Sequence, residues 1–466
     1  MRRLVLSDLL NQVGSRVGPV IVIVAATIAL GFGVAHVETG ITAPAQRQQA
    51  LYSTAAIVLV CTSMAAVVVL ATVLRLSIDL RRRDYALWQI AGVEPDAVRR
   101  IVTRQSAVLG VVGSLLGSGL AVLLVPVLGR SLDRMSYEPS GEPLELGLGG
   151  VLSLIVLVSA VSWLSSLPAA RSAARTPAIA VLRESTPPAP AMTWVRWTVL
   201  AGAAAGVALV ANGIVAGGER SRSVGLGIFL APAIAVCFAI ACPVVLPRVV
   251  AAWTALLPDR LSHAWYLARH GARHKTVGSS AGITTLLLAT AFLGSIFAVT
   301  GTATNWLAVG EADPELLAAG VDASNYSATD NPGVIATIIT LIGGPVLLAV
   351  IAAAMVVLIS GRARHRETAL LRAAGVRTAT IVAAAGLEGL ILALTALLLA
   401  LVAVVGSASF LALVFSVSAG APVLPHIPVL EIGLIAAAGT LVVSLATLVP
   451  TVVSLRTSVP KALSVI

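Results

Sequence analysis

The sequence predicts an all-α integral membrane protein with about ten transmembrane helices. Hydrophobic residues make up 58% of the 466-residue chain and charged residues only 11%, whereas about a quarter of the residues in a soluble domain are charged. Several long stretches carry almost no charge, among them residues 17–34, 51–74 and 333–359. Each is long enough to cross a hydrocarbon core of roughly 30 Å. Folding alone cannot hide so much apolar surface from water.

Ten apolar segments follow one another along the chain. They cover residues 17–38, 52–75, 105–129, 147–167, 195–216, 224–247, 280–302, 333–360, 381–416 and 429–453. The ninth is longer than one straight crossing requires, so we expect it to tilt, to kink near Gly406 or to end in the outer interface. Because further spans follow the first segment, we interpret it as a membrane helix and not as a cleaved signal peptide.

The basic residues indicate the orientation of these helices. With the N-terminus inside, 26 of the 31 Lys and Arg residues fall in inner segments. The positive-inside rule then predicts that both termini are cytoplasmic. The net charge of +10 thus points to a lipid bilayer and not to nucleic acid. Acidic outer segments around residues 133–145 and 311–330 are either solvated loop charge or an attraction for cationic substrates.

Two inner segments repeat each other. Residues 84–93 (DYALWQIAGV) align with residues 367–376 (ETALLRAAGV), at an offset of 283 residues. The span at 17–38 then corresponds to 280–302, and the three spans from 52 to 167 correspond to the three from 333 to 453. Because the repeats start six spans apart, they share one orientation in the membrane. The inverted repeats of many secondary transporters are therefore excluded.

Each repeated segment predicts a short amphipathic helix at the inner membrane face. Ala86, Leu87, Ile90 and Ala91 share one helical face, as do their counterparts in the second copy. A glycine follows each helix, at Gly92 and Gly375, where a left-handed residue ends a helix. One interpretation is an interfacial helix stabilised by lipid. The other is a docking element for a cytosolic partner, which the duplication would provide twice.

This pattern of acid, Ala-Leu, three variable residues and Ala-Gly-Val, followed by a long Gly-rich helix, resembles the FtsX/MacB/LolC-type ABC permease family. The resemblance covers nearly the whole chain. It implies that both segments are coupling helices, each seated in a groove of a cytosolic ABC ATPase, with two ATPase copies per permease. The implied coupling residues are Arg83, Asp84, Ala86, Leu87, Ala91, Gly92, Val93, Arg366, Glu367, Ala369, Leu370, Arg372, Ala374, Gly375 and Val376.

The same resemblance divides the chain into three parts. Residues 1–183 would form a first FtsX-like four-helix unit with its coupling helix near 79–100, and residues 251–466 a second unit with its coupling helix near 362–380. Residues 184–250 would hold a linker and two connector helices. Many relatives carry a large extracellular domain between the first two helices of a unit, whereas these connections are only about 13 and 30 residues here. A mechanism that depends on such a domain does not transfer.

ATP hydrolysis is not expected in this chain. Its two lysines, Lys275 and Lys461, do not follow a glycine, so no Gly-Lys-Ser/Thr phosphate-binding loop is present. ATP and Mg²⁺ would bind the partner ATPase, and we expect no cofactor, metal site or catalytic residue in the permease. His270 and His274 lie four residues apart but lack further ligands, so a solvated basic face is favoured over a metal site.

Two polar residues fall inside the predicted spans at equivalent positions. Glu388 lies about two turns into the ninth span, and Gln105 takes its place in the first half. An intramembrane carboxylate is costly and marks a functional candidate. We favour a structural or coupling role, such as a hydrogen bond to a neighbouring helix, over substrate binding. Glycines at 110, 113, 117, 386 and 389 favour close helix packing.

Three functions remain open from the sequence. The first is ATP-driven export of a lipophilic or amphipathic compound, such as a peptide, lipid or drug. The second is a signalling complex that passes ATP-driven motion to an extracellular or membrane partner. The third, an ion-coupled carrier, has only Glu388 as a candidate charge. High Ala, Val and Arg with little Lys indicates a GC-rich bacterial genome, so a bacterial plasma membrane is the expected location.

Overall fold

The computed structural model describes residues 13–135, 144–175, 192–216, 220–258, 262–274, 276–310 and 332–455. Within these ranges the chain forms twelve α-helices and no β-strand. The helices are α2 (Val13–Thr42), α3 (Ala45–Leu80), α4 (Arg82–Ile90), α5 (Pro95–Asp133), α6 (Leu148–Arg175), α8 (Trp194–Ala216), α9 (Arg220–Thr254), α10 (His263–His274), α11 (Thr276–Gly310), α13 (Pro332–Ala373), α14 (Thr378–Ala419) and α15 (Val429–Leu455). The prediction of an all-α fold is confirmed.

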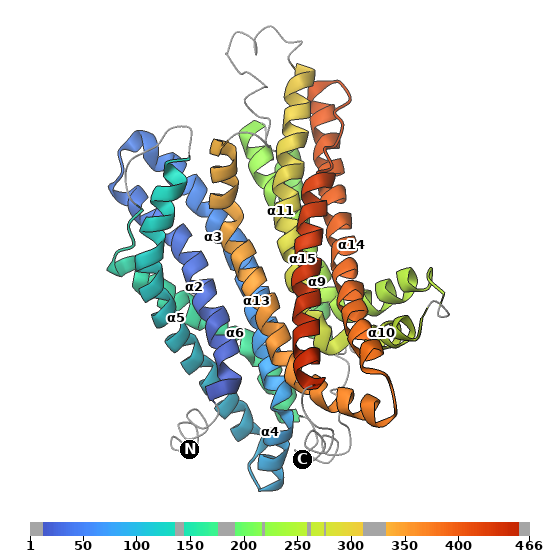
Figure 1. The fold of residues 1–466 in the computed structure, drawn as a ribbon. Coiled ribbons are helices and arrows are strands. Elements are labelled where there is room, and N and C mark those ends of the chain that lie inside the picture. The colour runs from blue at the N-terminus through green and yellow to red at the C-terminus, as the bar shows by residue number, and fades with distance from the viewer. Residues whose placement is uncertain are drawn as a thin grey trace.

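Nine helices in the described ranges are long and apolar enough to cross a membrane. They match the first nine predicted spans in order. For the tenth, residues Val429–Leu445 of α15 form a shorter apolar stretch. The start of α2 and the end of α15 lie at the same end of the bundle as α4 (Figure 1), as an even number of crossings requires. That this end faces the cytoplasm stays a prediction from the charge distribution.

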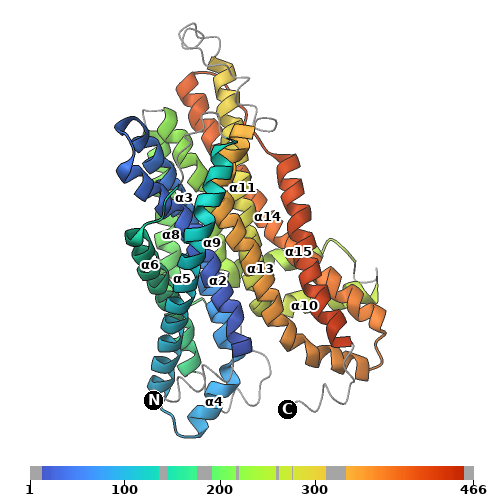
Figure 2. The same cartoon turned by 60° about the vertical axis from the view of Figure 1, so that its left-hand side comes forward.

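The helices pack as two similar sets of four. In the first set, α2 packs against α3 and α5, while α6 packs against α5 and α3. In the second set, α11 packs against α13 and α14, while α15 packs against α14 and α13. The sets meet where α13 lies against α2 and α3, and α3 also contacts α11 (Figures 1 and 2). The repeat found in the sequence is thus a repeat of helix packing.

The connector helices break this symmetry. Helix α8 packs mainly against α9, and α9 packs against α11 and α14 of the second set. The short helix α10 also lies against α14 and α9. Little of α8 is buried by protein, which is the environment of a helix at the lipid-facing edge of a bundle. The connectors therefore belong structurally with the second set.

Glycines bring helices close together within each set. A Cβ on Gly113 would lie 2.6 Å from the Ile23 side chain of α2, and one on Gly117 would lie 2.6 Å from that of Thr27. In the second set, a Cβ on Gly389 would lie 2.7 Å from the Thr447 hydroxyl of α15. These contacts leave no room for a side chain, so the predicted packing role is confirmed at these three glycines.

Matching hydrogen bonds tie the first helix of each set to the segment before its fourth helix. The Glu145 N–H donates to the Thr39 hydroxyl at 3.2 Å, and the His426 N–H donates to the Thr302 hydroxyl at 3.1 Å. In the first set only, the Glu38 carboxylate also accepts the N–H groups of Gly147 and Gly150, each at 2.6 Å. Glu38 thereby caps the N-terminus of α6, whose first N–H groups lack intrahelical partners.

The helices extend beyond the predicted apolar segments. Helix α2 continues to Thr42 and α3 begins at Ala45, so the predicted 13-residue outer connection is mostly helical. Helix α14 runs through Gly406 as a single helix of 42 residues. The hydropathy pattern marks only the apolar part of each helix, because polar ends can continue the same backbone hydrogen bonds outside the hydrocarbon. Residues 311–331 of the second outer connection lie outside the described ranges.

Candidate functional site

The first repeated segment forms α4, which lies at the end of the bundle beyond α3 (Figure 1). This helix ends in a Schellman motif. The Val93 N–H donates to the Trp88 carbonyl at 2.9 Å, and the Gly92 N–H donates to the Gln89 carbonyl at 3.0 Å. Gly92 has a φ of +91°, a left-handed conformation that glycine adopts without a Cβ clash. The chain therefore turns at the glycine that the sequence predicts.

The second repeated segment ends in the same way. The Val376 N–H donates to the Leu371 carbonyl and the Gly375 N–H to the Arg372 carbonyl, each at 3.0 Å, and Gly375 has a φ of +84°. This segment is not a separate helix but the last turns of α13, which turn aside from the rest of α13 in Figures 1 and 2. The two segments thus share their C-terminal geometry and differ in how they join the preceding helix.

Both segments expose the same positions. Leu87 is 49% exposed and Leu370 is 51% exposed. In the first copy Ile90 and Ala91 are exposed, and in the second Ala373 and Ala374. We call residues 87, 90 and 91 the first apolar strip, and residues 370, 373 and 374 the second. Each strip follows the i, i+3, i+4 spacing that aligns side chains along one helical face.

The opposite face of α4 anchors it to the bundle. Tyr85 and Ala86 are buried, and Tyr85 belongs to a cluster with Val98 of α5 and Ala170 of α6. Ala86 therefore does not share an exposed face with Leu87, as the sequence interpretation grouped it, and holds α4 in place instead. Sequence reasoning missed Tyr85, although an aromatic pair spaced three residues apart, Tyr85 and Trp88, is a signal for a buried face.

Among the other predicted coupling residues, several are half-buried and several have side chains outside the described part of the chain. Asp84 is half-buried in the first turn of α4, where a carboxylate is favoured by the helix dipole. Arg372 and Val376 are half-buried in the second copy, as Val93 is in the first. The side chains of Arg83, Arg366, Glu367 and Ala369 lie outside the described part of the chain.

Gln105 and Glu388 occupy equivalent buried positions. Gln105 is 4% exposed on α5 and Glu388 is 5% exposed on α14. A Cβ on Gly271 of α10 would lie 3.9 Å from the Glu388 Oε2 atom, so this carboxylate faces the α10 helix. Both polar groups are turned into the protein and not toward lipid. This placement fits contacts between helices better than a path open to substrate.

The described residues contain no group of three or more His, Cys, Asp and Glu side chains that could hold a metal ion. His270 instead lies against Tyr266, with ring centroids 4.2 Å apart, and its Nδ1 is 3.0 Å from the Tyr266 carbonyl oxygen. The duplicated strips at one end of the bundle are therefore the strongest candidate site.

The fold and these strips define a class: a multi-pass membrane protein made of two like-oriented four-helix units, each with an exposed apolar element at the same end. A family model for the FtsX-like permease C-terminal domain matches residues 56–178 and 339–459, together more than half of the chain. The matched regions begin 283 residues apart, as the repeat does. No curated protein and no solved structure matches the chain.

The chain therefore belongs to the FtsX-like permease family. It is a permease subunit of an ABC transporter, which fits the absence of a phosphate-binding loop from its sequence. Permeases of this family work with a cytosolic ABC ATPase. The predicted resemblance and the prediction of two fused units are confirmed.

Proposed function

We propose that this permease exports a lipophilic or amphipathic compound across a bacterial plasma membrane, driven by two cytosolic ATPase copies that bind and hydrolyse ATP with Mg²⁺. Each ATPase receives one apolar strip in a surface groove. ATP binding draws the two ATPases together and moves both strips. The two four-helix units then rearrange where α13 meets α2 and α3.

The observation that carries this proposal is the pair of strips. Leu87 and Leu370 are half-exposed large apolar side chains at equivalent positions on the end of the bundle. Most of the other exposed leucines lie along the membrane-spanning helices, where lipid covers them. At the predicted cytoplasmic end, the strips face water, lipid head groups or a partner, and exposed apolar patches of this kind mark interaction sites.

The short outer connection supports cargo transport. Only Ala43 and Pro44 separate α2 from α3, so the first unit has no extracellular domain at the place where such a domain would act on an outside partner. A transporter of membrane-soluble cargo does not require one. The proposed lipophilic cargo is compatible with this feature, because such a compound can enter the units from the bilayer.

Co-purification of the permease with the ATPase encoded beside its gene tests the proposal. We expect two ATPase copies per permease by native mass spectrometry. In inside-out vesicles, the complex should accumulate labelled lipophilic peptides or dyes when ATP is added. ATP turnover without accumulation of any cargo would contradict export and favour a signalling complex. A permease that binds no ATPase and shows ion-dependent uptake would overturn the proposal.

A further inference from the structure

A cavity of about 300 Å³ lies next to the first apolar strip. Its lining residues come from the turn after α4, the start of α5 and the end of α6, and they are Glu94, Pro95, Asp96, Arg99, Arg171 and Ala174. The Gln89 amide of α4 donates to the Ala174 carbonyl at 3.4 Å. This hydrogen bond joins α4, which carries the first strip, to a residue of the cavity wall.

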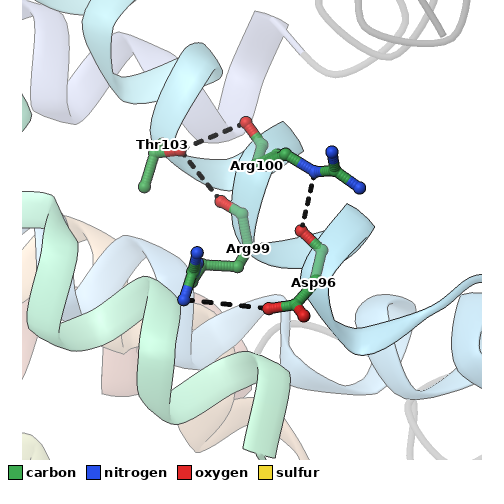
Figure 3. Close-up of polar contacts among 4 residues, drawn as sticks. All are labelled: Asp96, Arg99, Arg100 and Thr103. Carbon is green, nitrogen blue, oxygen red and sulfur yellow. Dashed lines mark hydrogen bonds and ion pairs between the residues drawn. The ribbon is translucent and has the colours of Figure 1, made fainter.

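Part of the cavity wall is held by local contacts. Arg99 Nη1 lies 3.7 Å from Asp96 Oδ1, and Arg100 Nε donates to the Asp96 carbonyl at 3.3 Å (Figure 3). The Thr103 hydroxyl lies 3.0 Å from the Arg99 carbonyl and 3.1 Å from the Arg100 carbonyl. These contacts fix the first turns of α5, which Pro95 begins.

Two charged side chains that line the cavity have no hydrogen-bond or ion-pair partner within the described ranges. Glu94 and Arg171 are exposed, and within the described ranges neither side chain makes a hydrogen bond or ion pair. Glu94 is the residue just before α5, yet its carboxylate does not cap that helix. An acidic and a basic group thus face the same cavity with their charges available to a partner.

The second four-helix unit lacks this chemistry beside its own strip; the first end and the second end are the strip-bearing ends of the first and second units, which lie at the same end of the bundle (Figure 1). Glu94 and Arg377 are equivalent, because each directly precedes the third helix of its unit in an extended conformation, with φ of −57° and −61°. At the repeat offset, Asp96 and Arg99 correspond to Ala379 and Val382. At the same offset Arg171 corresponds to Ser454. One charge is therefore reversed and the others are replaced by uncharged residues.

We infer that the two ends bind their ATPases by different chemistry: the first through its apolar strip plus charge pairs at Glu94 and Arg171, the second through its apolar strip without those pairs. The partner surface carries a basic residue opposite Glu94 and an acidic residue opposite Arg171. Arg377 repels the same basic residue at the second end. Two identical ATPases thus bind the two ends with unequal affinity: salt weakens binding at the first end by screening the pairs, and strengthens binding at the second end by screening the repulsion at Arg377.

This inference rests on the proposed function, and the test separates the two ends. Leu370→Asp leaves only the first end able to bind, and Leu87→Asp leaves only the second. The affinity of each variant for the purified ATPase is measured in detergent at low and high salt. Affinity should fall steeply with salt for Leu370→Asp and rise slightly for Leu87→Asp. Equal salt dependence at the two ends would overturn the inference while leaving the proposed function standing.

Variants with a reversed charge provide a second test of the inference. On the Leu370→Asp background, Glu94→Arg should weaken ATPase binding about tenfold at low salt, and Glu94→Gln should have a smaller effect in the same direction. On the Leu87→Asp background, Arg377→Glu should strengthen binding. Because Glu94 and Arg377 are exposed, these variants keep the fold, which an unchanged thermal unfolding midpoint verifies. An unaltered affinity in all three variants, or a wild-type chain that binds no ATPase, would overturn the inference, and the latter also the proposed function.

Discussion

Leu87 and Leu370 lie 283 residues apart in the chain, yet their side chains are exposed to almost the same extent at equivalent positions of two matching helix ends. Each sits five residues before a left-handed glycine, Gly92 or Gly375. The backbone hydrogen bonds between each leucine and its glycine also correspond one to one. Two surfaces with one backbone geometry support the proposal that two related ATPase subunits bind them.

Replacing both leucines by aspartate should abolish ATPase binding. A charged side chain cannot enter an apolar groove without losing its hydration, which costs several kcal/mol when no partner is provided. Co-purification should give two ATPase copies with the wild type, one with either single variant and none with the double variant. Leu256→Asp is the control, because Leu256 is 83% exposed after α9 and belongs to neither strip. Full binding by the double variant would contradict the assignment of the strips.

Gly92→Val should destabilise the protein and displace α4. A β-branched residue at a φ of +91° is strained, at a cost of about 1–2 kcal/mol. Gly92→Asn should cost less, since asparagine tolerates the left-handed region better. Thermal unfolding in detergent, followed by tryptophan fluorescence, measures the loss. Gly202→Ala is the control, because Gly202 is helical and nothing lies within 4 Å of its Cβ position; equal effects at both sites would argue against the turn.

Glu38→Ala should loosen the start of α6. It removes the acceptor of two N–H groups, with an expected cost of about 1–2 kcal/mol. Hydrogen exchange at the Gly147 and Gly150 amides should accelerate, and the unfolding temperature should fall. Glu431→Ala is a matched control, since Glu431 lies in the first turn of α15 and its side chain makes no hydrogen bond within the described ranges. Unchanged exchange at the two amides would disprove the cap.

Gly117→Val should separate α2 from α5. The added Cβ would lie 2.6 Å from the Cβ of Thr27, and overpacking of this kind costs about 1–3 kcal/mol. Gly119→Val places the same side chain two residues away, where nothing lies within 4 Å. The first variant should lower the unfolding temperature and the second should not. Similar unfolding temperatures for both would show that the α2 and α5 interface accommodates the side chain.

Glu388→Gln should be tolerated and Glu388→Leu should not. The first half of the protein uses an amide, Gln105, at the equivalent buried position, so an amide preserves hydrogen bonding. Leucine leaves the polar groups opposite Glu388 without a partner, at about 1–3 kcal/mol. Thermal unfolding and ATPase turnover in reconstituted complexes measure both. If the glutamine variant loses turnover but keeps its stability, the charge itself acts in coupling.

The fold could be predicted largely from the sequence, because each membrane helix must satisfy its own backbone and therefore appears as a long apolar run. The repeat offset then matched helices to one another, since the alignment of Gly92 with Gly375 pairs the three spans from 52 to 167 with the three from 333 to 453. Helix ends were predicted less well. Thr42 and Ala45 lie outside the apolar runs of the sequence, where hydropathy gives no signal for the boundary between helix and loop.

The candidate site was predicted only in part for a similar reason. The glycine that ends each segment is read directly from the sequence, because few other residues adopt its conformation. Which face of α4 is buried depends on α5 and α6, which are distant in sequence. Ala86 and Leu87 are adjacent and both apolar, and only the cluster around Tyr85 decides that one is buried and the other exposed. The cavity beside Glu94 likewise requires Arg171 from another helix.

The continuity of helix α13 affects how a movement of the second strip reaches the bundle. Its helical backbone is continuous from Pro332 to Ala373, a path of about 63 Å at a rise of 1.5 Å per residue, although its last turns turn aside from the rest. It is also the helix that lies between the two units. A movement at Leu370 would therefore pass through unbroken helix to the place where α13 packs against α2 and α3. In the first half the chain is jointed at Arg81, between α3 and α4, where rotation can absorb part of a push on Leu87. The two strips are thus joined to the bundle by connections of different stiffness.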